Sequence, residues 1–190
     1  MSCRHPSILS TATATLVLVD LQEPFLKRVE ERGRVVDRCA FLASSAAILN
    51  LPVLTTLQYA ERMGPVVPEI ADALATQEPG AGSFDKMSFS CAGSEPFLER
   101  LRGMGRGQVL LAGVETHICV AQTALDLIHR GYQVHVAADA VSARGMDRHK
   151  LGMEKMRDSG VIPCSAEQAV FELLKESGTP QFKQILKLVK

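Results

Sequence analysis

The feature that most constrains this chain is an alternation between short, mainly apolar segments and longer stretches with helical periodicity. Residues 15–19 read Thr-Leu-Val-Leu-Val, which is too short for a helix and carries apolar side chains on both faces. A strand of that kind is typical of a parallel sheet that helices cover on both sides. Residues 34–49 follow with apolar side chains at every third or fourth position, as in an amphipathic helix. Repeated units of this kind predict an α/β fold.

The remaining elements follow from the same patterns. Further strands are expected at 52–57, 108–112, 132–138 and 161–163, and further helices at 68–74, 96–102, 116–130, 146–158 and 165–174, with a polar helix near the C-terminus. Right-handed crossovers place the carboxyl ends of parallel strands at one edge of the sheet, where ligands of such folds bind. The informative residues are therefore those that directly follow the strands.

Length and charge limit the classes of function. The 190 residues fit a single domain over 1–190, with a flexible leader expected at 1–12. Lys and Arg number 21, and Asp and Glu also number 21, so the formal net charge is zero. Proteins that bind nucleic acid or anionic membranes usually carry a basic excess, so we expect neither partner. No apolar run reaches the ~18 residues of a membrane-spanning helix.

The five cysteines indicate a reducing compartment. Their number is odd and they lack Cys-x-x-Cys spacing, and the five histidines show no ligand-like spacing. We therefore expect free thiols, no metal and no cofactor, in the cytoplasm. The leader is rich in Ser and Thr and poor in acidic residues, which keeps a mitochondrial location as the alternative.

Cys119 is the candidate nucleophile. It falls in the first turn of the helix expected at 116–130, just after a strand. The free N–H groups and partial positive charge of a helix N-terminus favour a thiolate, so we expect a lowered cysteine pKa. The same N–H groups can stabilise an oxyanion. The alternative is that Cys119 is a small buried apolar side chain, as most single cysteines are.

Two charged residues are candidates to act with this thiol. Asp20 ends the apolar strand at 15–19, where a carboxylate is costly to bury unless it is paired or functional. It could accept the thiol proton and return it, or it could be an N-cap or a structural ion pair. Lys86 could hold a carboxylate and a thiolate in their charged forms, although a single lysine is more often a solvated surface residue.

Three segments together resemble the isochorismatase-like cysteine hydrolases. Residues 18–25, Leu-Val-Asp-Leu-Gln-Glu-Pro-Phe, resemble the aspartate motif of that family, and residues 84–90, Phe-Asp-Lys-Met-Ser-Phe-Ser, resemble its lysine motif. Residues 113–120, Gly-Val-Glu-Thr-His-Ile-Cys-Val, resemble its cysteine motif, which is long and specific. Later segments match as well, so the resemblance covers about residues 13–175, the expected core of the domain.

The resemblance implies a fold and a reaction. The fold is a three-layer α/β/α arrangement around a mostly parallel, six-stranded, Rossmann-like sheet, in a homo-oligomer that is a dimer or larger. The implied triad has Cys119 as nucleophile, Asp20 as general base and acid, and Lys86 as their electrostatic partner. The implied reaction is metal-independent cleavage of a C–N bond, of amide or ureido type, in a small molecule through a thioester-type intermediate.

The family also has a non-proline cis peptide just before the helix that carries the cysteine. By resemblance this bond joins Val114 and Glu115 here. It would turn backbone N–H groups of the segment from Glu115 through Thr116 to Cys119 toward the substrate oxygen. These residues are therefore the implied oxyanion site.

Neighbouring side chains give a first prediction of the substrate pocket. Phe25, Tyr59 and Phe84 are expected to form partly apolar walls, with core packing as the alternative for each, and Gln22 or Thr116 to supply polar contacts. Residues two apart on a helix do not face each other, so a Cys–His pair is disfavoured, and His117 is expected to border the pocket or to face solvent.

The second strand separates this chain from the metal-dependent members of the family. Nicotinamidases of the family carry a metal-binding Asp-x-His after that strand, whereas this chain has Gln58-Tyr59-Ala60 there. The chain therefore resembles the metal-free branch known as isochorismatase-domain proteins. That branch also resembles a protist protein labelled a mitochondrial-associated ribonuclease.

Two alternative functions follow. One is an RNA-associated protein or ribonuclease on the same fold, for which Arg100, Arg102 and Arg106 form the candidate basic patch. The other is a redox or binding module that uses the Cys119 thiol without hydrolysis.

Overall fold

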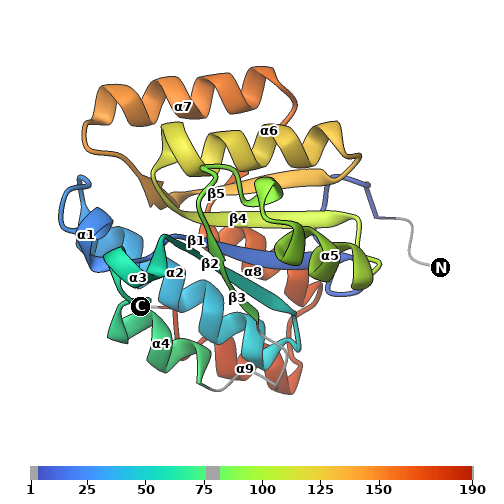
Figure 1. Cartoon of the computed structure of the whole chain (residues 1–190). Helices are drawn as coiled ribbons and strands as arrows, with labels where there is room; N and C mark the ends of the chain where they lie inside the picture. The colour runs from blue at the N-terminus through green and yellow to red at the C-terminus, as the bar shows by residue number, and fades with distance from the viewer. Residues whose placement is uncertain (1–3, 76–81, 190) are drawn as a thin grey trace.

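A computed structural model describes residues 4–75 and 82–189 of the chain. Its centre is a six-stranded sheet with the strand order β3-β2-β1-β4-β5-β6, and each pair of neighbouring strands is parallel (Figure 1). The chain builds outward from β1 in one direction and from β4 in the other, so the switch point of the topology lies between these two strands. The expected α/β/α fold around six strands is confirmed, and the sheet is parallel throughout.

The bounds of the elements are as follows. The strands are β1 (Ala14–Val19), β2 (Val53–Gln58), β3 (Gly82–Lys86), β4 (Gln108–Val114), β5 (Gln133–Ser142) and β6 (Ile162–Cys164). The helices are α1 (Glu23–Leu26), α2 (Arg32–Ile48), α3 (Ala60–Met63), α4 (Pro68–Leu74), α5 (Glu95–Gly103), α6 (Ala121–His129), α7 (Met146–Asp158), α8 (Ala166–Leu174) and α9 (Pro180–Ile185). Two short turns complete the set, the 3-10 turn η1 (Cys91–Gly93) and the π-helical turn η2 (Thr116–Val120).

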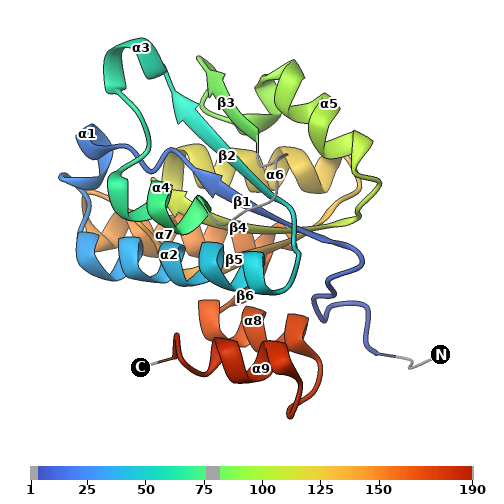
Figure 2. The same ribbon diagram turned by 90° about the horizontal axis from the view of Figure 1, so that it is seen from below.

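Helices cover both faces of the sheet. α2, α4, α8 and α9 lie on one face, and α5, α6 and α7 lie on the other (Figure 2). In β1, Leu16 and Leu18 belong to the core of the first face, whereas Val17 and Val19 belong to the core of the second. Successive side chains of a strand point to opposite faces, so a strand buried on both sides must be apolar throughout.

The expected helix at 116–130 is two elements. Its first turn is the π-helical turn η2, in which Val120 N–H donates to the carbonyl oxygen of Glu115 at 3.3 Å. The regular helix α6 follows it. α7 packs closely on η2 because Gly152 has no side chain, and a Cβ there would lie 2.9 Å from the Cα of His117. The cysteine motif is therefore held by a close approach of α7.

Other differences from the expected elements have local causes. β3 was not expected because it is an edge strand in which four of the five residues are exposed or partly buried and only Lys86 is buried. β5 continues to Ser142, beyond the expected end at 138, since a register shift opposite Leu111 and Gly113 lets it follow β4 to its end. α1 and α3 have four residues each, which is too short for a periodic signal.

The expected flexible leader is mostly packed against the domain. Residues 1–3 lie outside the described residues. Within residues 4–12, Leu9 is fully buried. The side-chain amide of Gln108, from β4, donates to the carbonyl oxygen of Ile8 at 3.1 Å. This segment therefore lies along the amino end of the sheet.

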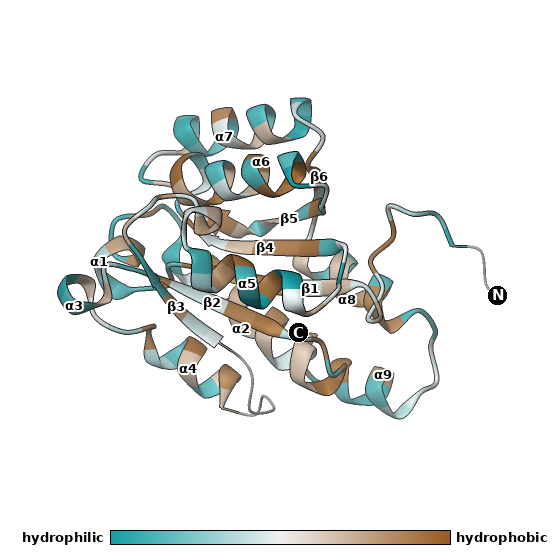
Figure 3. Cartoon of the chain, turned by 45° about the vertical axis from the view of Figure 1, so that its right-hand side comes forward, coloured by the Kyte–Doolittle hydropathy of each residue, from teal (hydrophilic) through white to brown (hydrophobic). Residues whose placement is uncertain are grey.

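The distribution of hydropathy matches a layered domain. Apolar residues are concentrated in the central strands, most clearly along β4, while the outer surface of α7 is largely hydrophilic (Figure 3). Over the described residues, every helix is too short or too polar to cross a bilayer.

Candidate active site

The three expected triad positions meet at the carboxyl edge of the sheet. Asp20 directly follows β1, Lys86 is the last residue of β3, and Cys119 lies in η2 after β4. In the ladder between β1 and β4, Val19 lies beside Gly113. Gly113 has φ +115°, and a Cβ there would come within 2.1 Å of the Val19 carbonyl oxygen. Glycine therefore allows the two strand ends, and the residues that follow them, to approach each other.

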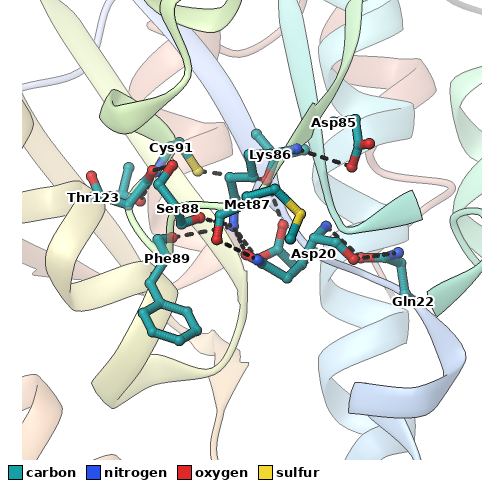
Figure 4. A network of polar contacts seen from close by, with 12 residues as sticks. Asp20, Gln22, Asp85, Lys86, Met87, Ser88, Phe89, Cys91 and Thr123 are labelled. Atoms are coloured by element: carbon teal, nitrogen blue, oxygen red, sulfur yellow. Dashed lines mark hydrogen bonds and ion pairs between the residues drawn. The ribbon is translucent and has the colours of Figure 1, made fainter. Parts of the chain in front are cut away.

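Asp20 and Lys86 form a buried ion pair. Lys86 Nζ lies 2.7 Å from Asp20 Oδ2, and the two side chains are 0% and 2% exposed, respectively. Figure 4 shows the contacts converging on the Lys86 ammonium, which also donates to Gln58 Oε1 at 2.6 Å and contacts the carbonyl oxygens of Ser88 at 3.2 Å and Phe89 at 3.1 Å. An ammonium has three N–H donors, so these four acceptors occupy all of them.

The carboxylate of Asp20 is held from a second side. Thr56 Oγ1, on β2, donates to Asp20 Oδ1 at 2.8 Å. Asp20 has φ 51°, a left-handed conformation that is uncommon for a residue other than glycine. Burying a carboxylate without partners costs several kcal/mol or more, and here Lys86 and Thr56 supply those partners. Strained backbone of this kind is concentrated at functional sites.

Cys119 and Asp20 share the wall of a small cavity of about 70 Å³. The residues that line it are Asp20, Phe25, Gln58, Phe89, Val114, Glu115, Ile118 and Cys119. Lys86 lies behind Asp20 and is not one of them. Three larger hollows lie on the described part of the surface, one of them between the leader and Gln133, and these three contain none of the triad positions.

The Cys119 thiol holds its proton more tightly than an ordinary thiol. Its residue is 8% exposed. Burial raises the pKa of the Cys119 thiol, the charge of Asp20 and a hydrogen bond to Asp20 raise it further, and Lys86 lowers it. The expected lowering of this pKa is wrong, because loss of hydration and the carboxylate charge outweigh the helix N-terminus. The resting group is a thiol next to a carboxylate.

A second thiol, that of Cys91, lies next to Thr56, which donates to the Asp20 carboxylate. Cys91 begins η1, and its Sγ lies 3.5 Å from Thr56 Oγ1. Burial, followed by the charge of Asp20, raises the pKa of Cys91 to about 11. Cys91 N–H donates to Thr123 Oγ1 at 2.9 Å, which fixes η1 against α6. Cys91 does not line the cavity, so its role here is packing.

The implied oxyanion segment contributes its residues in different ways. The peptide bond between Val114 and Glu115 is cis, and both residues line the cavity. Glu115 Oε2 accepts hydrogen bonds from the backbone N–H of Arg144 at 3.0 Å and from its Nε at 3.1 Å. The Thr116 side chain is buried and lies 3.0 Å from Nδ1 of His149 on α7. Thr116 therefore anchors η2, and its side chain does not face the cavity.

Of the five residues expected to bind substrate, Phe25 lines the cavity and Gln22 does not. The Gln22 side chain is fully buried. Its Oε1 accepts from Gln58 N–H at 2.8 Å, and its Nε2 donates to the carbonyl oxygen of Gly64 at 2.7 Å. Both ends of the Gln22 amide are thus used to connect the ends of two strands and the loop that follows.

The other three lie away from the cavity. Tyr59 caps the short helix α3 with φ 47°. Phe84 packs edge-to-face on Phe97 of α5 at a centroid distance of 5.9 Å, because it lies two residues before the strand end and so further into the core. His117 lines a hollow against α7, together with Gly152. Of the three aromatic residues predicted as walls, Phe25 therefore lines this cavity and Tyr59 and Phe84 do not.

Three residues near the cavity, Thr56, Phe89 and Ile118, were not predicted from the sequence, whereas Gln58 was expected at the ligand edge. Gln58 and Thr56 lie at the end of β2, and the rule that ligands bind at strand ends already pointed to Gln58. The contact of Thr56 with the carboxylate depends on register, which the sequence does not reveal. Phe89 and Ile118 line the cavity from irregular segments, where no periodic pattern exists.

Within residues 4–75 and 82–189, no group of three or more His, Cys, Asp or Glu side chains is arranged to hold a metal ion. At the end of the second strand, Gln58 instead uses its amide to contact Lys86 and to donate to the carbonyl oxygen of Met87 at 2.9 Å.

Comparison with known proteins places this site in a family. A sequence model of the isochorismatase domain matches residues 14–168. The secreted isochorismatase effector Isc1 of Phytophthora sojae is 40% identical over 179 residues, which cover 94% of this chain and 85% of that protein. Isochorismatase domain-containing protein 2A of Mus musculus is 37% identical over 180 residues, 94% of this chain and 83% of that protein.

Solved structures agree with the sequence comparisons. A structure described as the MAR1 ribonuclease of Caenorhabditis elegans superposes with a TM-score of 0.89 at 31% identity, covering 95% of this chain and 91% of that one. YcaC of Escherichia coli, described as an octameric hydrolase of unknown specificity, shares the fold with a TM-score of 0.88 at 22% identity, covering 98% of this chain and 92% of that one. With the domain matched over most of its length, this chain belongs to the isochorismatase family.

Proposed function

We propose that this chain is a metal-independent cysteine hydrolase that cleaves a C–N bond, of amide or ureido type, in a small molecule. The observation that carries the proposal is the shared cavity wall of Cys119 and Asp20, with Asp20 tied to Lys86 at 2.7 Å. A nucleophile beside a base that a third group orients is the arrangement of a nucleophilic hydrolase. Family membership supports the same reaction class.

The first half of the reaction transfers the acyl group to sulfur. Cys119 Sγ attacks the carbonyl carbon while the thiol proton passes to the Asp20 carboxylate. The C–N bond then breaks, and the departing nitrogen takes the proton back from Asp20, which leaves a thioester on Cys119. The raised pKa of Cys119 fits this order, because the thiolate forms only as the substrate accepts it.

The second half releases the product. A water molecule gives a proton to Asp20 as it attacks the thioester carbon, and the C–S bond breaks. The proton returns to sulfur, so the thiol and the carboxylate are both restored. Lys86 stays charged throughout and balances the carboxylate when Asp20 is ionised.

The oxygen that becomes negative needs donors. We place it against backbone N–H groups of the segment from Glu115 to Cys119, where the start of a helix leaves N–H groups without intrahelical partners. The N–H of Ile118 is not one of these donors, since it donates to the Glu115 carbonyl oxygen at 3.0 Å. Phe25 contributes an apolar wall for the rest of the substrate.

The test is ammonia release from a panel of small primary amides and ureides. We expect the wild-type protein to turn over at least one of them and the Cys119→Ala variant to lose turnover by at least about a thousandfold. Cys164→Ala is the matched control, because Cys164 is also buried but lies at β6, away from the cavity. Full turnover by the Cys119→Ala variant would contradict the proposal.

Selective alkylation of the proposed nucleophile gives a second test. YcaC of Pseudomonas aeruginosa is described with a covalent acrylamide, and acrylamide is a thiol-reactive amide of suitable size. We expect acrylamide to label Cys119 before Cys39, Cys91 or Cys164, which mass spectrometry of the digested protein would reveal. Preferential labelling of Cys39 or Cys91 would place the reactive thiol elsewhere.

Ribonuclease activity is the second candidate, favoured by the likeness to the C. elegans structure described as a ribonuclease. The candidate basic patch counts against it. Arg102 pairs with Glu95 at 2.9 Å, and Arg106 donates to the carbonyl oxygen of Ala14 at 2.9 Å. RNA cleavage by the wild type that Cys119→Ala retains, with affinity that falls as salt rises, would favour this function over the hydrolase.

The redox module is the weaker alternative. Oxidation of cysteine follows thiolate character, and the pKa of Cys119 is raised. Rapid and selective formation of a sulfenic acid at Cys119 would nevertheless revive it.

We also propose a single-domain homo-oligomer in a reducing compartment. The octameric state described for YcaC of E. coli supports the first part, and light scattering of the purified chain tests it. The four cysteines that the structure describes are free, which supports the cytoplasm or a mitochondrial compartment. The P. sojae relative is described as secreted, so a secreted location is the outcome that would overturn this proposal.

A further inference from the structure

We infer that the cavity takes a small, uncharged substrate and rejects one that carries a carboxylate. The inference rests on the proposed function, because it names the substrate class of the same site. It comes from the charges around the cavity, which neutralise one another within the protein. A charged ligand would therefore find no free partner on the walls that the structure describes.

The first cation is already fully used. Lys86 is buried and donates to or contacts four oxygen acceptors, including Asp20 and Gln58. It lies behind the carboxylate and does not line the cavity. A substrate carboxylate could bind it only by displacing one of these contacts, which would leave a buried polar group without a partner.

The second cation is also held. Arg144 uses its Nε and its backbone N–H on Glu115. The Glu115 side chain is 10% exposed, whereas that of Arg144 is 43% exposed. Glu115 lines the cavity and Arg144 does not. The two ionisable groups on the described wall besides the thiol are thus both carboxyl groups, Asp20 and Glu115, and an anion would meet them before their partners.

The rest of the wall is apolar apart from Gln58, whose side-chain amide already contacts Lys86 and donates to the carbonyl oxygen of Met87. Phe25, Phe89, Val114 and Ile118 line the cavity, and they offer no side-chain hydrogen bond to a charged group. The volume of about 70 Å³ lies well below the ~300–1,000 Å³ of pockets for drug-sized ligands. A compact neutral amide or ureide, with its polar end at Cys119 and an apolar end toward the phenylalanines, fits both properties.

Two alkylating reagents of nearly equal size test the charge selection directly. Iodoacetamide is neutral and iodoacetate is anionic, and the same thiolate sulfur displaces iodide from each, so the thiolate fraction cancels in the ratio of their rates. We expect the rate ratio of iodoacetamide to iodoacetate at Cys119 to exceed the ratio at free 2-mercaptoethanol by at least about tenfold, because like charges repel strongly in a poorly solvated site. Mass spectrometry of the Cys119 peptide gives both rates.

Variants of the Glu115–Arg144 pair test whether the charges of this pair cause the preference for iodoacetamide. Glu115→Gln removes a wall carboxylate and frees Arg144, so the preference for iodoacetamide should fall. Arg144→Gln leaves Glu115 without its neutralising partner, so the preference should rise. Glu95→Gln, at an exposed ion pair whose residues do not line the cavity, is the matched control and should leave the ratio unchanged.

The outcomes separate this inference from the hydrolase proposal. A ratio at Cys119 equal to that of 2-mercaptoethanol, or lower, overturns the inference. Equal turnover of a neutral amide and its carboxylate-bearing analogue also overturns it, while the hydrolase proposal stands. Conversely, a strong preference for iodoacetamide without turnover of any amide supports the charge selection and counts against the hydrolase.

Discussion

Two ion pairs in this molecule have nearly the same geometry and opposite surroundings. Lys86 and Asp20 approach to 2.7 Å with side chains 0% and 2% exposed. Arg102 and Glu95 approach to 2.9 Å with side chains 54% and 64% exposed. Exposed pairs contribute little because water solvates both charges, whereas buried charges depend on their partners. Distance alone therefore does not tell which pair matters to the protein.

The surroundings also separate a functional pair from an ordinary one. A buried ion pair is seldom more stabilising than apolar side chains of similar volume. Under the proposed function, the pair of Asp20 and Lys86 serves the chemistry of Cys119 rather than stability. The exposed pair of Arg102 with Glu95 has no such neighbour.

Removing one partner of each ion pair should give the largest difference between the two pairs in the free energy of unfolding. We expect Lys86→Met to lower the free energy of unfolding by about 3–5 kcal/mol, because it leaves the buried Asp20 carboxylate without its cation. Arg102→Met should cost less than about 1 kcal/mol. Urea denaturation of both variants measures the two values. Equal losses would mean that burial does not distinguish the pairs.

The buried thiols extend the comparison to groups that are neutral at pH 7. Burial raises the pKa of Cys164 from 9.0 to about 12. The folded state then holds this proton where the unfolded state has lost it, so the free energy of unfolding falls as pH rises above about 9. The contribution is at most about 1.4 kcal/mol per pH unit for one thiol.

The control for this prediction is the difference between two proteins. Between pH 9 and 11 the free energy of unfolding of the wild type should fall more steeply than that of Cys164→Ala, while titrating lysines cancel in the comparison. Parallel pH profiles would show that the Cys164 thiol titrates as it does in water.

Removing Thr56, the neutral partner of the Asp20 carboxylate, should lower the free energy of unfolding less than removing Lys86. Thr56→Val removes the hydrogen bond to Asp20 Oδ1, and we expect a loss of about 1.5–3 kcal/mol, since the acceptor is charged. The neighbouring Thr55 donates to the carbonyl oxygen of Gly82 at 3.2 Å, so Thr55→Val should cost only about 0.5–1.5 kcal/mol. Chemical denaturation of the two variants compares them, and the reverse order would be evidence against a special role for Asp20.

The effect of salt on the coupling energy should be the smallest of these effects, and it should be confined to the exposed pair of Arg102 and Glu95. A double-mutant cycle for Arg102 and Glu95 should give a coupling of about 0.2–1 kcal/mol that shrinks between low salt and 1 M salt. The corresponding cycle for Lys86 and Asp20 should be nearly independent of salt, because ions do not reach the buried pair. A buried coupling that falls with salt would mean that the pair is solvated.

The sequence predicted the architecture well, because the strands and helices have simple patterns. β1 is apolar on both faces and α7 was expected at its observed bounds, 146–158. The edge strand β3 was not predicted because its residues, Gly-Ser-Phe-Asp-Lys, include a single large apolar side chain and so carry no strand pattern. The short helices α1 and α3 were not predicted, because four residues are too few to show a helical periodicity.

The site was predictable only in part, because several of its contacts depend on strand register and on the path of loops, which the sequence does not reveal. Asp20 and Cys119 follow strands, so topology alone brings them to one edge. The burial of Lys86, the contact of Thr56 with the carboxylate and the position of Phe89 depend on register and loop path. The direction of the Cys119 pKa was predicted wrongly because helix position was visible in the sequence, whereas burial and the nearness of Asp20 were not.

The central claim is that Asp20, Lys86 and Cys119 act as one unit, and the pKa of Cys119 tests it most directly. The rate of alkylation against pH, read by mass spectrometry, gives this pKa in the wild type, Asp20→Asn and Lys86→Met. The account predicts a wild-type pKa above the ordinary ~8.5, a lower value in Asp20→Asn and a higher value in Lys86→Met, since Asp20 raises the pKa and Lys86 lowers it. An ordinary pKa that neither substitution changes would contradict the account.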